Sequence, residues 1–109
     1  MAKAMNDVDP LRYPIGKFER PNVPLSPAAR AALIDDLERL PAMLRQLVGS
    51  LSDEQLDTSY RPGGWTLRQV IHHVPDSHMN GYVRMKLAVT ESEPTIKLYE
   101  EALWAELPD

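Results

Sequence analysis

The sequence contains no cysteine, which excludes disulfide bridges and zinc sites that use thiolate ligands. It has no apolar run approaching the ~20 residues that span a bilayer, and its start, MAKAMNDVDPLRYP, lacks the apolar core of a signal peptide. We therefore expect a cytoplasmic protein without a membrane partner. Lysine and arginine are not clustered and the net charge is −4, so nucleic acid is not an expected partner either.

The remaining composition is that of one small globular domain. The 109 residues are 43% hydrophobic and 26% charged, which allows one modest core. No segment alternates apolar and polar residues with period two, so we predict no strands. The fold class that follows is all-α.

Prolines divide the first 24 residues into pieces that are too short for a helix. We predict an extended, proline-rich arm over residues 1–24, with a disordered start and with apolar side chains that anchor it across helices. The expected anchors are Leu11, Tyr13, Ile15 and Phe18.

A long helix is predicted over residues 26–49. Ser26 followed by Pro27 is a typical helix start, and Gly49 is a typical end. Leucines then recur at alternating spacings of four and three, as in helical bundles. They are Leu33, Leu37, Leu40, Leu44, Leu47 and Leu51. Pro41 interrupts the helix but not the leucine register, so we expect a kink rather than two helices.

Two capping boxes predict the next two helices. Ser52 with Gln55 starts a short helix over residues 52–58, and Thr66 with Gln69 starts a long one over residues 66–91. Trp65 is expected to pack on Val70 across the second cap.

All three histidines of the chain lie in the helix predicted over residues 66–91, which we call the histidine helix. Pro75 lies inside it and is expected to bend it just after His73. A last short helix is predicted over residues 98–107.

A polar stripe runs along the histidine helix. At about 100° per residue, five polar side chains lie within roughly 60° of His73. They are Gln69, Asp76, Ser77, Asn80 and Arg84. Apolar residues flank the stripe on both sides, which favours a stripe that faces a pocket between helices. The alternative is an ordinary solvent-exposed face on which Gln69 serves only as a cap.

The histidine spacings limit what this helix can bind. His72, His73 and His78 are one and five residues apart, so no two of them can chelate one ion from a straight helix. Of the three, His73 is the candidate metal ligand, but the residues alone favour a buried, hydrogen-bonded structural histidine at this position. Asp76 and Asn80 are expected pocket groups, and Asp76 could orient an imidazole. His72 and His78 are weaker candidates because both point away from the stripe. No catalytic residue is assigned.

Three segments resemble the YfiT branch of the DinB-like superfamily of metal-dependent hydrolases. They are YRPGGWTLRQVIHHVPDSHMN at residues 60–80, LRYPIGKFE at residues 11–19 and KLAVTE at residues 86–91. The resemblance implies an antiparallel four-helix bundle with a divalent ion, nickel or zinc, held by three histidines. One ligand is at the position of His73, and the other two form a His-x-x-x-His pair on the last helix.

Relatives of this family include bacillithiol and other low-molecular-weight thiol transferases, so the resemblance implies a small-molecule substrate such as a thiol. The chain differs from the family at Pro75, where relatives usually carry alanine. Residues 1–109 also contain only two long helices and no His-x-x-x-His pair. We therefore expect one incomplete domain: a truncated family member, a fragment, or a domain completed by another chain. The alternative function is a non-catalytic helical interaction module. An incomplete bundle leaves apolar helix faces uncovered, and these faces favour a homodimer.

Overall fold

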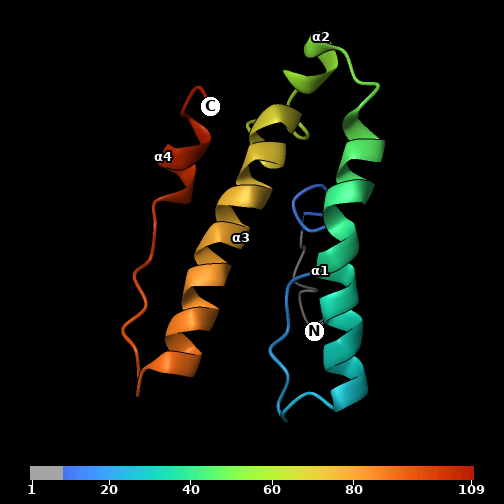
Figure 1. Cartoon of the computed structure of the whole chain (residues 1–109). Coiled ribbons are helices and arrows are strands. Elements are labelled where there is room, and N and C mark those ends of the chain that lie inside the picture. Colours follow the sequence, from blue (N-terminus) through green and yellow to red (C-terminus); the bar gives the residue numbers. More distant parts are fainter. Residues whose placement is uncertain (1–8) are drawn as a thin grey trace, which may run out of the picture. The chain divides into compact units, whose positions relative to one another are not determined.

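The structure is a computed structural model that describes residues 9–109. The start of the arm, which we expect to be disordered, lies outside the described residues. The described elements are the helices α1 (Pro27–Val48), α2 (Asp53–Leu56), α3 (Leu67–Thr90) and α4 (Glu101–Ala105) (Figure 1). Residues 9–109 contain no strand; the β-type pairing described there is one isolated bridge between Ser59 and Thr66. The prediction of an all-α chain is confirmed.

The chain divides into two compact units, Met1–Leu51 and Ser52–Asp109. In the first unit the Ser26 hydroxyl accepts a hydrogen bond from the Ala29 amide at 3.1 Å, and Pro27 is the first residue of α1. The helix continues through Pro41 and ends at Val48. Its length matches the range expected from the leucine spacing.

The arm before α1 is irregular and carries a turn in which the Tyr13 amide donates to the Asp9 carbonyl at 2.9 Å. The exposed fractions of Ile15 and Phe18 are 98% and 88%. These two side chains therefore do not anchor the arm, in contrast to the expectation from the sequence. Apolar character alone does not bury a side chain when the backbone around it forms no regular element.

In the second unit both predicted capping boxes are present. Ser52 caps α2 through Gln55, and Thr66 caps α3 through Gln69. Arg68, in the first turn of α3, joins the two helices: its Nε donates to Asp57 at 2.7 Å and its Nη2 donates to Asp53 at 3.1 Å.

The helix α2 is shorter than the predicted range of 52–58. It ends at Leu56, where the Thr58 hydroxyl donates to the Glu54 carbonyl and the chain turns towards α3. The helix α3 continues through Pro75 to Thr90.

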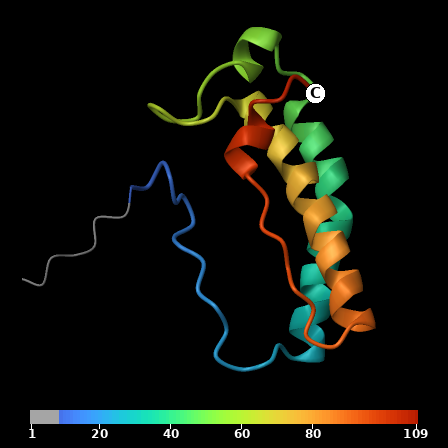
Figure 2. The same ribbon diagram turned by 90° about the vertical axis from the view of Figure 1, so that its left-hand side faces the viewer.

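After α3 the chain reverses and runs back along it, so that α4 lies beside the first turns of α3 (Figures 1 and 2). The helix α4 is shorter than the predicted range of 98–107, because residues 98–100 are not helical and no side chain caps its start at Glu100. Ala105 at its end is only 6% exposed. No helix in residues 9–109 combines the length and the apolar character that crossing a bilayer requires.

Candidate functional site

His73 lines a cavity of about 550 Å³ between α3 and the segment that runs back along it. Three lining residues come from α3, and four come from the returning segment and the start of α4. In chain order they are His73, Ser77, Arg84, Leu98, Tyr99, Glu100 and Glu101. The structure therefore brings together His73, Ser77 and Arg84, which the helical projection placed on one stripe.

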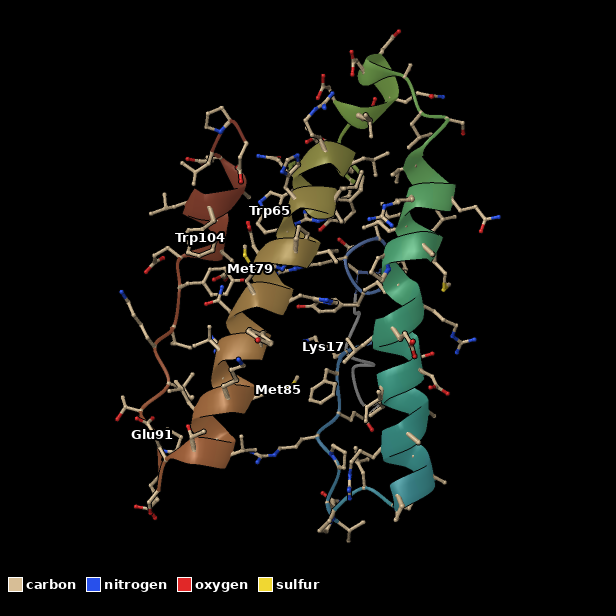
Figure 3. The ribbon with its side chains drawn as sticks, in the orientation of Figure 1. Lys17, Trp65, Met79, Met85, Glu91 and Trp104 are labelled. Carbon is tan, nitrogen blue, oxygen red and sulfur yellow. The ribbon has the colours of Figure 1, made fainter. Side chains whose placement is uncertain are left out.

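One nitrogen of the His73 imidazole has no hydrogen-bond partner among the described residues. This atom, Nδ1, is buried. The ring meets the Trp65 indole edge to face, with centroids 5.0 Å apart and planes at 64°. Trp65 lies at the start of α3 (Figure 3). Because buried polar atoms normally have partners, the unpartnered nitrogen marks His73, which also lines the cavity, as a candidate site residue.

Asp76 and Asn80 lie close to each other, and neither lines this cavity, but Asn80 lines the adjoining cavity described below. Asp76 is a buried charged residue, with 8% of its surface exposed. The Asn80 side-chain amide donates to the Asp76 backbone carbonyl at 2.8 Å. Since His73 Nδ1 has no partner in the described chain, Asp76 does not orient the imidazole through that atom.

Gln69 and His72 line a separate small cavity of about 100 Å³ at the end of α4. The other lining residues are Arg68, Ala105, Leu107, Pro108 and Asp109. His78 is exposed on the outer surface of α3. The three histidines therefore lie in three different environments, and only His73 lines the larger cavity.

A second cavity of about 380 Å³ adjoins that of His73 and is mostly apolar. Both cavities are lined by Arg84, Leu98 and Tyr99. Met79 from α3 and Trp104 from α4 also line the second cavity (Figure 3). An apolar cavity beside a polar one of this size can hold a small organic molecule and direct its polar end towards His73.

The described residues do not by themselves form a metal site. In residues 9–109, no group of three or more histidine, aspartate or glutamate side chains is arranged to hold an ion. His73 alone fits the role of a donor, through its unpartnered Nδ1. A catalytic site for zinc or a related ion needs about three protein ligands, and one copy of residues 9–109 does not bring three together.

The wall of the cavity opposite His73, where Tyr99, Glu100 and Glu101 lie, does not follow from the sequence patterns. These residues are more than 25 positions away in the sequence, and they face His73 because the chain reverses after α3. No local pattern indicates such a reversal. The contact of Trp65 with His73 was not predicted either, because the capping pattern predicts a contact of Trp65 with Val70.

A sequence model described as the DinB superfamily matches residues 36–109. Proteins of Bacillus cereus strain B4264 and Bacillus anthracis strain A0248, each named "Putative metal-dependent hydrolase", are 54% identical to this chain over 105 residues. The match covers 96% of this chain and 58% of each relative. The chain thus spans little more than half the length of these relatives.

A similar solved structure is that of YfiT from Bacillus subtilis, described as a probable metal-dependent hydrolase with an unusual four-helix bundle topology. It is 48% identical to this chain, with a TM-score of 0.87 over 93% of this chain and 57% of the YfiT chain. The expected resemblance and the expected bundle type are both confirmed.

Proposed function

The chain belongs to the DinB superfamily, and from this premise we propose that it is part of a metal-dependent hydrolase in which His73 binds a divalent ion. The observation that supports the role of His73 is its buried, unpartnered Nδ1 beside the 550 Å³ cavity. The names of the relatives support metal dependence and hydrolysis. One copy of the described residues brings one such donor to the cavity, so the remaining ligands are proposed to come from a second copy of the chain and from bound water.

The residues around His73 are proposed to orient its ring, accept a proton and bind the substrate. Trp65 fixes the imidazole ring through its edge contact. The Glu100 and Glu101 carboxylates, on the opposite wall, can accept a proton from a nucleophile. The adjoining apolar cavity would hold the non-reacting part of a small substrate. Asp76 and Asn80 remain proposed pocket groups, and Asp76 remains a proposed outer-shell partner of an imidazole.

The ion, when bound, would lower the pKa of a water molecule or a thiol and so prepare it as a nucleophile. A low-molecular-weight thiol as substrate would make the protein a thiol-S-transferase rather than a hydrolase. The absence of cysteine from this chain is compatible with that reading, since the reacting thiol would then come from the substrate. Nickel and zinc are the proposed ions, because imidazole suits both, and the proposed location is the cytoplasm.

A second candidate function is a non-catalytic helical interaction module. Two observations favour it: the described residues bring one donor rather than three to the cavity, and large apolar side chains such as Leu37 and Val89 are exposed on α1 and α3. In this case the exposed apolar side chains bind another protein surface, and His73 has a structural role.

Metal analysis of the purified chain after reconstitution with nickel, zinc or manganese distinguishes the two functions. With a second copy of the chain supplying further donors, we expect about one tightly held ion per dimer. Replacing His73→Ala should lower the affinity by at least the roughly 10–100-fold that loss of an outer-shell partner costs. The matched control is His78→Ala, because His78 is exposed and away from the cavity. The absence of bound metal under all three conditions would support the interaction module instead.

A further inference from the structure

The side-chain amide of Gln69 makes hydrogen bonds in two directions. Its Oε1 accepts from the Thr66 backbone amide at 3.0 Å, which completes the capping box of α3. Its Nε2 donates to the Ala105 backbone carbonyl at 3.1 Å, 36 residues further along the chain. One amide therefore satisfies an unpaired donor at the start of α3 and an unpaired acceptor at the end of α4.

This pair of bonds requires an amide. Glutamate serves equally well at this position of a capping box, because its oxygen also accepts from the cap backbone. An ionised glutamate cannot donate to a carbonyl, whereas glutamine has both an acceptor and a donor. The bond to Ala105 is thus a function of Gln69 that is independent of its role as a cap.

The bond to Ala105 acts on the cavity of His73. The helix α4 has only five residues and no side-chain cap at its start, so it depends on contacts with α3 for its position. Tyr99, Glu100 and Glu101, which precede or begin this helix, form the wall opposite His73. We propose that Gln69 is a positioning residue that clamps the end of α4 to the start of α3 and thereby fixes this wall. The functional meaning of the clamp depends on the proposed role of His73, but the clamp itself does not.

The experiment separates the cap from the clamp with the variant Gln69→Glu. The control is Gln55→Glu, which makes the same change in the capping box of α2, where Gln55 Oε1 accepts from the Ser52 amide at 2.9 Å. We expect amide hydrogen exchange at Trp104, Glu106 and Leu107 to become about tenfold faster in Gln69→Glu and to stay unchanged in Gln55→Glu. Exchange in the first turns of α3 should remain slow in both variants.

The second measurement is the NMR signal of the imidazole rings at a fixed pH without added metal. In Gln69→Glu the His73 ring signals should shift while those of His78 stay in place. The uncharged variant Gln69→Met should shift the His73 signals as well, because a charge one helical turn from His73 would by itself move them. Unchanged exchange in α4 and unchanged His73 signals would overturn the proposal, as would equal changes in Gln69→Glu and Gln55→Glu.

A third measurement uses the unsubstituted protein, so the proposal can be tested even if Gln69→Glu does not fold. The side-chain NH2 protons of Gln69 should exchange at least about tenfold more slowly than those of Gln55, because only Gln69 donates to a backbone carbonyl. Equal exchange would refute the clamp. None of these measurements requires a bound metal, so a failure of the proposed metal function leaves their outcome unaffected.

Discussion

A buried imidazole nitrogen without a partner is unfavourable. The cost of leaving a buried polar group unsatisfied is about 1–3 kcal/mol, and in this chain that group is Nδ1 of His73. The Trp65 ring packs edge to face against the imidazole with centroids 5.0 Å apart, which favours the observed ring orientation. A ligand that pairs with Nδ1 would therefore bind a group that is already positioned and already desolvated.

Replacing Trp65→Leu tests this arrangement. We expect the free energy of unfolding to fall by at least about 0.5–1.5 kcal/mol, the usual worth of an aromatic pair beyond its buried area, because the smaller leucine also buries less apolar surface. We also expect the His73 ring signals in NMR spectra to shift, because the indole no longer lies against them. Thermal unfolding and NMR spectroscopy at one pH are the two measurements.

The control for Trp65 is Trp104→Leu. Trp104 also takes part in an aromatic pair, with Tyr99 at 4.8 Å, but it has no ring contact with His73. It should lose a similar amount of stability with a much smaller shift of the His73 signals. A His73 spectrum that is the same in wild type and Trp65→Leu would show that the indole does not position the imidazole.

At the scale of the elements, two ion pairs of Arg68 connect α2 with α3. The Arg68 guanidinium donates to both Asp57 and Asp53. The hydrogen bond from Arg68 lowers the pKa of the Asp57 carboxyl below its usual value of 3.8, and the bonds to Asp57 and Asp53 raise the pKa of Arg68. Both shifts favour the charged forms, so the interaction between Arg68 and Asp57 is strongest at pH values at which Asp57 is ionised.

The stability of this connection should depend on pH. Because the Asp57 pKa is lower in the folded chain than in the unfolded chain, its contribution is fully present above 3.8 and is lost as the pH falls through the lower folded value. The variant Asp57→Asn lacks this contribution. The difference in melting temperature between wild type and variant should be largest near neutral pH and should shrink at and below pH 3.8.

An Arg68→Gln background provides the control, since the partner that lowers the Asp57 pKa is then absent. There the further change Asp57→Asn should leave the pH profile unaltered. A pH-dependent difference that persists without Arg68 would assign the effect to another group.

The elements also show what can be predicted from this sequence. Both capping boxes are local patterns of four residues, so the starts of α2 and α3 follow directly from Ser52 and Thr66. The polar stripe correctly placed Ser77 and Arg84 beside His73 because all three lie on one helix. The opposite wall could not be predicted, since it depends on the chain reversal and on the bond from Gln69 to Ala105.

At the scale of the whole molecule, many large apolar side chains are exposed. On α1 these include Leu33, Leu37 and Leu47, which belong to the leucine repeat, and on α3 they include Val83 and Val89. Large contiguous apolar patches usually mark an interaction surface. The spacing of the leucines on α1 is that of a helix that packs against another helix.

We predict that the 109-residue chain self-associates as a homodimer through the leucine repeat of α1. Exposed leucines at spacings of four and three favour helix pairing, and a charge introduced among them would be desolvated in the dimer. The variant Leu37→Glu should therefore weaken the dimer at least about tenfold, as expected when a central contact is lost. The control is Ala42→Glu, which adds the same charge about 140° away on the same helix. Sedimentation velocity over a concentration series measures both. A chain that is monomeric throughout, or a dimer that Leu37→Glu leaves intact, would remove this surface from consideration and with it the main support for the interaction module.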